Sequence, residues 1–303
     1  MRHWMLLLFL LTYATPTLAV DGVLEINQTC AVQTGCFSGD TPGYPVTIDG
    51  SAGRSYRLTS DLNVGNANID GLFLTTSRIT IDFNGFTLSV FGIGSGTGGG
   101  ISGSGTNGLN ARFTTIKNGV IRAARSTGIR LAGAKGVRVE NMTLDFNLGG
   151  AMHLGLAAQI VRNRSSDNGG GTNSAIVAGD GSLISENVVI GSGMSGISCG
   201  DGCTVTQNTV SESGGSGIFV GLGATVSGNT AFNNDGDGIT AADGSNVSGN
   251  TASSNGELGL DLTGLVSYLE NVMVGNTTGG VSSGINRGGN YCSGTGVTSF
   301  TCP

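Results

Sequence analysis

The stretch TVSGNTAFNNDGDGITAADGSNVSGNTASSNG, residues 225–256, contains the pentapeptide Val-Ser-Gly-Asn-Thr twice, at positions 226–230 and 247–251. The two copies lie 21 residues apart. An asparagine follows a short Val/Ile segment every 21 to 24 residues along much of the chain, at Asn118, Asn141, Asn163, Asn187, Asn208, Asn229, Asn250 and Asn271. Because a fixed period of about 20 to 50 residues is typical of solenoid proteins, this spacing predicts one coil of a β-solenoid per period.

A second periodic column consists of apolar residues that mostly follow a glycine. Its members precede the asparagines by about eleven residues and are Ile129, Met152, Ile176, Ile197, Ile218, Ile239 and Leu260. Parallel strands lie about 4.8 Å apart, so equivalent residues of successive coils become direct neighbours. We expect the apolar residues to form an inward column. We expect the asparagines to form a ladder in which each amide donates to one coil and accepts from another.

The composition agrees with an all-β fold of short strands. The chain has 56 glycines, four prolines and 11% charged residues. Abundant Gly, Ser, Asn and Thr around short Val/Ile segments favour brief strands and tight turns. We expect a parallel β-helix over residues 61–275, most regular over 128–271, between an N-terminal cap at 20–60 and a C-terminal cap at 276–303. Caps are expected because the ends of an open solenoid expose strand edges.

The N-terminus indicates export, and export permits disulfides. The segment MRHWMLLLFLLTYATPTLA combines a basic residue, an apolar run and small residues at its end, which predicts a signal peptide over residues 1–19. The six cysteines fall in three close pairs, for which we predict local disulfides: Cys30 with Cys36, Cys199 with Cys203, and Cys292 with Cys302. The first and last pairs would staple the two ends. We expect a secreted or periplasmic protein without a membrane span, and a monomer.

These features together resemble a known superfold. Gly-Ile/Leu and Val-x-x-Asn-Thr motifs at this spacing, with the entry segments YRLTSDLNV and ITIDFNGFTL, resemble the right-handed parallel β-helix proteins of the pectate-lyase-like superfold. The closer resemblance is to exported bacterial β-helix repeat proteins, most of which lack an assigned activity. The superfold includes lyases, epimerases, glycosidases and scaffolds, so it does not assign a function. The catalytic motifs of pectate lyases, mannuronan epimerases and polygalacturonase-type glycosidases are not found in this sequence, and none of their residues can be carried over.

One candidate catalytic pair lies on the outside of the predicted sheet. Residues that follow the apolar column point outward, and they are Arg130, His153, Val177, Ser198, Phe219, Thr240 and Asp261. His153 is the only histidine after the predicted signal peptide. A polysaccharide lyase or epimerase needs a base for the proton beside a uronate carboxylate and a cation to neutralise that carboxylate, roles that His153 and Arg130 suit. The alternative is an exposed histidine on a solvated sheet.

Two aspartates are candidate calcium ligands. Asp180 and Asp201 each precede a glycine and lie seven residues before an asparagine of the ladder. Neighbouring carboxylates repel one another, and Ca²⁺, which prefers oxygen ligands, would relieve the repulsion. Asp-Gly is also a common turn sequence, and a set of six oxygen ligands is not visible. Calcium is the only cofactor that the sequence suggests.

Charge is unevenly distributed along the chain. Residues 112–164 contain nine basic and two acidic residues, whereas residues 165–286 contain eleven acids and no Lys or Arg. The basic coils could attract an acidic polysaccharide or another surface glycan, and Arg125, Arg138 and Arg164 are the predicted contacts. Export and a net charge of −6 do not favour nucleic acid. We predict a non-catalytic, exported module that binds carbohydrate or has a structural role; the alternative is a lyase, epimerase or glycosidase that acts on acidic glycans near Arg130 and His153.

Overall fold

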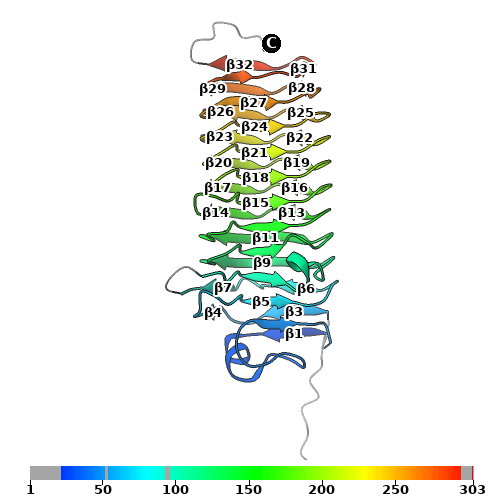
Figure 1. Ribbon diagram of the computed structural model, residues 1–303, viewed down its shortest axis with the longest axis vertical. Helices are drawn as coiled ribbons and strands as arrows, with labels where there is room; N and C mark the ends of the chain where they lie inside the picture. The colour runs from blue at the N-terminus through cyan, green and yellow to red at the C-terminus, as the bar shows by residue number, and fades with distance from the viewer. Residues whose placement is uncertain (1–21, 52–53, 93–95, 295–301, 303) are drawn as a thin grey trace, which may run out of the picture.

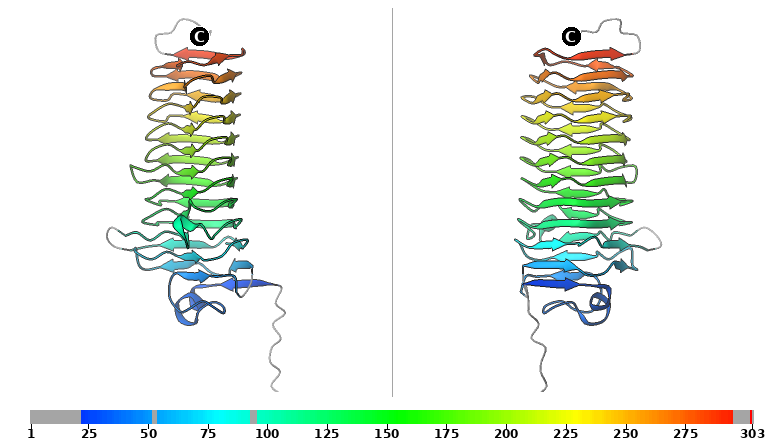
Figure 2. Two further views of the ribbon diagram at one scale, coloured as in Figure 1. Left: turned by 45° about the vertical axis from the view of Figure 1, so that its right-hand side comes forward. Right: turned by 180° about the vertical axis from the view of Figure 1, so that it is seen from behind.

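The computed structural model describes residues 22–51, 54–92, 96–294 and 302, so the predicted signal peptide at 1–19 lies outside the described residues. The described chain forms an elongated column of stacked coils that runs from the N-terminal to the C-terminal end (Figures 1 and 2). All strand pairings are parallel and join successive coils. The predicted parallel β-helix is therefore confirmed.

Each coil contributes one strand to an 11-stranded sheet. Its strands are β2 (Val46–Ile48), β5 (Leu72–Leu74), β8 (Ile101–Gly103), β10 (Ile129–Leu131), β12 (Met152–Leu154), β15 (Ile176–Ala178), β18 (Ile197–Cys199), β21 (Ile218–Val220), β24 (Ile239–Ala241), β27 (Leu258–Leu262) and β30 (Gly279–Val281).

The remaining strands belong to a 21-stranded sheet that covers two sides of the column, here called its two faces. One face holds β1 (Val23–Ile26), β3 (Ser55–Leu58), β6 (Thr80–Asp82), β13 (Gln159–Val161), β16 (Leu183–Ser185), β19 (Thr204–Thr206), β22 (Thr225–Ser227), β25 (Asn246–Ser248), β28 (Ser267–Leu269) and β31 (Ile285–Asn286). The other holds β4 (Leu62–Val64), β7 (Thr87–Val90), β14 (Arg164–Asn168), β17 (Val188–Ser192), β20 (Thr209–Ser213), β23 (Thr230–Phe232), β26 (Thr251–Ser253), β29 (Val272–Asn276) and β32 (Tyr291–Gly294). Two longer strands span both faces: β9 (Thr115–Arg122) and β11 (Arg138–Asp145). Within the described residues, helical structure is limited to η1 (Cys30–Thr34) and η2 (Thr106–Gly108).

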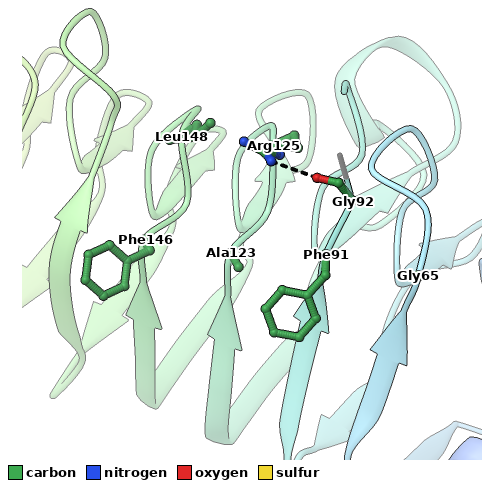
Figure 3. A pocket seen from close by; sticks show the side chains of 7 residues that line it. All are labelled: Gly65, Phe91, Gly92, Ala123, Arg125, Phe146 and Leu148. Atoms are coloured by element: carbon green, nitrogen blue, oxygen red, sulfur yellow. Dashed lines mark hydrogen bonds between the residues drawn. The ribbon is translucent and has the colours of Figure 1, made fainter. Parts of the chain in front are cut away.

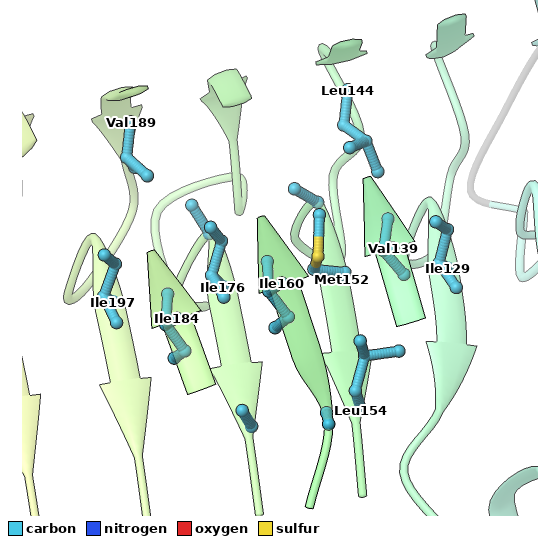
Figure 4. Close-up of a cluster of buried hydrophobic side chains, with 14 of the residues drawn as sticks. Ile129, Val139, Leu144, Met152, Leu154, Ile160, Ile176, Ile184, Val189 and Ile197 are labelled. Carbon is cyan, nitrogen blue, oxygen red and sulfur yellow. The ribbon is translucent and has the colours of Figure 1, made fainter. Parts of the chain in front are cut away.

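The core is built from columns of equivalent apolar residues. Ile129, Met152, Ile176 and Ile197 pair in register and are almost completely buried, as the inward column predicted (Figure 4). Val139, Ile160 and Ile184 form a corresponding column from the 21-stranded sheet. Because each side chain packs on its equivalent in the next coil, every coil needs both neighbours to bury its apolar surface.

The asparagine ladder is present, but it begins later than predicted. In Asn208, Nδ2 donates to Ile184 O at 2.9 Å and to Asn229 Oδ1 at 3.0 Å, while Oδ1 accepts from the backbone N–H of Asn187 at 3.0 Å. The ladder runs through the buried residues Asn163, Asn187, Asn208, Asn229, Asn250 and Asn271 and ends on Asn290.

The prediction that Asn118 and Asn141 belong to this ladder is wrong. Strand pairing places Gly119 and Met142 on the level of Asn163. Asn118 and Asn141 precede those positions and adopt left-handed backbone conformations, with φ of 61° and 53°. Asparagine tolerates this conformation better than most residues. In these two coils it therefore supplies the turn residue rather than the inward amide.

A second polar ladder lies at the opposite end of the same strands. Asn147 Nδ2 donates to Asn168 Oδ1 at 2.9 Å, and Asn234, Asn255 and Asn276 repeat this contact farther along the column. Ser192 and Ser213 occupy the two intervening levels, between Asn168 and Asn234. Each ladder follows a column of left-handed residues, so each corner combines one left-handed residue with one inward polar side chain.

All three predicted disulfides are confirmed: Cys30–Cys36, Cys199–Cys203 and Cys292–Cys302. The first and last lie near the two ends of the column. Among the described residues, no helix has the length and apolar character needed to cross a membrane.

Candidate functional site

The outward column of the 11-stranded sheet brings Arg130 and His153 together as predicted. Arg130 on β10 pairs in register with His153 on β12, and Val177 follows in the next coil. Both the arginine and the histidine are exposed. In the described part of the chain, Arg130 takes part in none of the ion pairs. Its guanidinium is therefore available to an external anion.

A polar pocket of about 200 Å³ adjoins Arg130, on the side away from His153's coil. Asp70, Ser102, Asn107 and Arg130 line it, together with Phe73 and backbone from the glycine-rich segment around η2. The carboxylate of Asp70 accepts hydrogen bonds from the backbone N–H of Gly99, at 2.6 Å, and from the hydroxyl of Ser102. These bonds orient an acid toward the same pocket as the arginine.

Electrostatics favour the neutral form of His153. Although the His153 side chain reaches solvent, partial desolvation by its surroundings lowers its pKa below the ordinary value of 6.5, and the positive charge of Arg130 lowers it further. At neutral pH the imidazole is therefore unprotonated and able to accept a proton. A base, a free cation and an oriented acid thus lie within four successive coils, those of β5, β8, β10 and β12, with Asp70 in the turn before β5.

A second, more apolar groove of about 520 Å³ lies along a corner of the 21-stranded sheet (Figure 3). Its walls include Phe91, Phe146 and Leu148, whose exposed fractions are 47%, 54% and 45%. Figure 3 shows the two phenylalanine side chains on either side of the coil that carries Ala123. With about 4.8 Å per coil, the two rings are spaced by about 10 Å along the column.

Arg125 gives this groove a charged group. Its guanidinium donates to Gly92 O at 2.7 Å, which holds the side chain in the groove while leaving other N–H groups for a ligand. The groove therefore offers two exposed aromatic rings and an anchored cation. Aromatic rings that remain in contact with water bury large apolar areas when a ligand covers them.

The other predicted basic contacts differ from one another. Arg138, a predicted glycan contact, is engaged within the molecule: it contacts Glu140 Oε2 at 2.6 Å and donates to Gln159 Oε1 at 2.6 Å. The hydrogen bond from Arg138 also lowers the pKa of Glu140. Arg164 on β14 is exposed and, within the described chain, forms none of the ion pairs. Its role in binding stays a prediction.

Asp180 and Asp201 are neighbours, but both carboxylates act on the backbone. Asp180 Oδ1 accepts from the N–H of Asp201 at 3.0 Å, and Asp201 Oδ1 accepts from the N–H of Leu222 at 2.8 Å. Across the described residues, no group of three or more His, Cys, Asp or Glu side chains is placed to hold a metal ion. The contacts explain the aspartates as turn residues, and calcium binding stays a prediction.

Sequence reasoning did not find Asp70, Phe91 or Phe146 as site residues. The N-terminal coils are longer and less regular than the 21-residue coils, so the period does not show which residues lie on the same level. The sequence does give a weak indication for Phe146. This residue stands directly before the inward Asn147, at a left-handed turn position where the side chain is exposed.

The comparison with protein families agrees with this architecture. A family model described as a right handed beta helix region matches residues 99–255 and, in a second match, 157–294. The chain belongs to this right-handed β-helix family. No match was found among curated proteins.

Several solved structures are similar in fold to this right-handed β-helix. A Dettilon tailspike protein has 14% identity and a TM-score of 0.42 over 91% of this chain, which spans 56% of the tailspike chain. A double mutant of the periplasmic alginate epimerase AlgG has 13% identity and a TM-score of 0.46, over 88% of this chain and 82% of its own. The A-module of the Azotobacter vinelandii mannuronan C-5 epimerase AlgE6 has 14% identity and a TM-score of 0.42, over 88% of each chain. At these identities the likeness concerns the fold alone.

Proposed function

We propose that this protein is an exported β-helix that binds a polysaccharide along its side, in the groove of Phe91, Phe146 and Arg125. The observation that carries the proposal is the pair of exposed phenylalanine rings on either side of an anchored arginine in a groove of about 520 Å³. The apolar faces of sugar rings can stack on aromatic side chains, and a uronate carboxylate would pair with the guanidinium. A repeating ligand suits a site whose two rings are spaced along the column.

Binding should be measured with the full mature chain by calorimetry or by affinity electrophoresis against a panel of acidic and neutral polysaccharides. Phe146→Ala is expected to weaken binding roughly tenfold, since a well-placed aromatic contact contributes about 1–2 kcal/mol. The matched control is Phe232→Ala, because Phe232 is also an exposed phenylalanine, at 38%, but does not line the groove. Equal effects of the two variants, or no binding to any polysaccharide in the panel, would count against the proposal.

Arg125→Gln tests the preference for acidic glycans. Loss of the cation should weaken binding to acidic polysaccharides and reduce its dependence on salt, with little effect on neutral ones. Arg164→Gln is the companion variant, and it tests whether the predicted contact at Arg164 adds to the same surface.

A second candidate function is chemistry on an acidic glycan beside His153, which the adjoining pocket of Asp70 and Arg130 favours. Arg130 would pair with the uronate carboxylate, and neutral His153 would take the proton from the adjacent carbon. In a lyase, the bond from the next carbon to the glycosidic oxygen then breaks, a double bond forms, and the leaving oxygen gains a proton. In an epimerase, a proton returns to the opposite face of the same carbon.

Ultraviolet absorbance detects the unsaturated product of a lyase, and proton NMR detects inversion at the carbon. Activity that His153→Ala abolishes, while binding in the Phe146 groove is kept, would make this the main function. The absence of both signals over the panel would leave binding as the only proposal.

A further inference from the structure

One edge of the column has a charge pattern that reverses halfway along the molecule. The edge consists of the turns that follow the strands of the 11-stranded sheet (Figure 1). Backbone hydrogen bonds between successive turns align five residues in one column. In each bond, the residue that follows one member of the column donates its N–H to the carbonyl of the next member. The bonds are Phe113 N to Lys135 O, Gly136 N to Leu156 O, Ala157 N to Asp180 O, and Gly181 N to Asp201 O. From the N-terminal side the column reads Arg112, Lys135, Leu156, Asp180, Asp201, which we name the charged edge.

All five side chains of the charged edge face solvent. Leu156 is 51% exposed, and the four charged residues are exposed as well. In the described part of the chain, Arg112 and Lys135 take part in none of the ion pairs or side-chain hydrogen bonds. The cations of this edge are therefore not consumed within the molecule.

The charged edge is complementary to itself when it is turned end for end. Two cations lie on one side of Leu156 and two anions on the other, at equal numbers of coils. With about 4.8 Å per coil, Lys135 and Asp180 lie about 5 Å from the level of Leu156, and Arg112 and Asp201 about 10 Å. A two-fold axis through Leu156 would thus place a cation opposite an anion at each of four positions, which is the self-complementarity that a symmetric dimer requires.

We propose that two copies of this protein associate side by side and antiparallel along the charged edge, with the two Leu156 side chains in contact on the two-fold axis. Lys135 of each copy pairs with Asp180 of the other, and Arg112 pairs with Asp201. This inference replaces the expectation of a monomer and does not depend on the proposed glycan groove, which lies at a different corner of the coils.

The order of the charges selects this partner over others. A polyanion would be attracted to Arg112 and Lys135 but repelled by Asp180 and Asp201, and a cation would bind only at the acidic end. A partner must present the reverse order of charges at the same spacing. The edge of a second, antiparallel copy has that order.

Sedimentation velocity of the full mature chain tests the proposal at two salt concentrations. The dimer should be populated at about 10 mM salt and weaken at about 150 mM, because the screening length falls from roughly 30 Å to roughly 8 Å. Lys135→Glu places like charges opposite each other at two symmetric positions and should raise the dissociation constant at low salt roughly tenfold or more.

A charge exchange distinguishes this interface from any other. Asp180→Lys alone should weaken the dimer as Lys135→Glu does, whereas the double variant Lys135→Glu/Asp180→Lys restores opposite charges and should restore the dimer. Asp180 also accepts a hydrogen bond from the N–H of Asp201, so circular dichroism should verify the fold, and Asp180→Asn, which keeps an acceptor, provides a neutral comparison. A protein that stays monomeric at low salt and high concentration, or a dimer that neither single variant weakens, or one that the double variant fails to restore, would overturn the proposal. Glycan binding should be unchanged in Lys135→Glu, so the two proposals can fail separately.

Discussion

Replacement of Asn208 by aspartate tests whether the buried asparagine ladder stabilises the column. Asn208 is 1% exposed and lies in the middle of the ladder. Its Oδ1 accepts from the N–H and Nδ2 of Asn187 at 3.0 and 2.9 Å, and an aspartate oxygen would keep these two bonds. Its Nδ2 donates to Ile184 O, Thr206 O and Asn229 Oδ1 at 2.9 to 3.0 Å, and in Asn208→Asp a second oxygen would face these three acceptors.

The expected loss of stability follows from those contacts. A buried carbonyl that loses its donor costs about 1–3 kcal/mol, and an unpaired buried charge costs about 3–5 kcal/mol unless the group takes up a proton. We expect Asn208→Asp to lower the free energy of unfolding by about 3–5 kcal/mol at neutral pH. Burial among acceptors would raise the folded-state pKa of the new carboxyl, so the loss should shrink as the pH falls toward 4 and protonation supplies one donor.

Urea denaturation followed by circular dichroism measures this effect at both pH values. Asn233→Asp is the matched control, because Asn233 is an exposed turn residue of the neighbouring corner whose replacement should change stability by about 0.5 kcal/mol or less. If Asn208→Asp is no less stable than Asn233→Asp, the ladder does not stabilise the fold in the way its hydrogen bonds indicate.

Three further predictions concern ionisation and backbone conformation. By NMR, His153 should titrate below 6.5, because burial and Arg130 disfavour its protonation; Arg130→Gln should raise this pKa, and an unchanged value would contradict the role of the arginine. Since the folded-state pKa of His153 is lowered, this residue should reduce stability as the pH falls below 6.5. Burial, followed by the nearby acidic residues, raises the pKa of Asp237, so Asp237→Asn should stabilise the protein at neutral pH, an advantage that denaturation curves should show disappearing below about pH 3.8. Gly228 has a φ of 65°, so Gly228→Ala should lower the free energy of unfolding by about 1 kcal/mol, and a variant as stable as the wild type would argue against a left-handed turn at this position.

The regular coils could be predicted closely because parallel strands convert sequence period into spatial neighbourhood. Ile176, Ile197 and Ile218 are 21 residues apart and lie level with one another, so the inward column and the outward column beside it followed from spacing alone. The pairing of Arg130 with His153 followed in the same way. The second ladder also has a visible signal in the sequence, the 21-residue spacing of Asn234, Asn255 and Asn276.

Errors arose where the spacing changed. Asn141 and Asn163 are 22 residues apart, and strand pairing shows that the level partner of Asn163 is Met142. A shift of one residue exchanges an inward amide for an outward turn residue, since adjacent positions face opposite directions. Arg138 is a separate case. It pairs with Glu140, which is two positions away on the same strand, and residues two positions apart on a strand point to the same side.

The sequence by itself determined the parallel β-helix, its coil length, the local disulfides and the order of charges along the chain. These properties depend on the repeat and on residues that are close in the chain. They can therefore be worked out from the sequence of one coil and the distance to the next. The tertiary structure alone decided that Asp70 shares a pocket with Arg130, that Phe91 and Phe146 flank one groove, and that Arg112 to Asp201 form one edge. The pocket and the groove lie in coils of unequal length, where spacing in the chain does not show which residues are level. The edge consists of turns, and their alignment depends on every strand between them. In all three cases the stacking of the coils sets the positions of the residues.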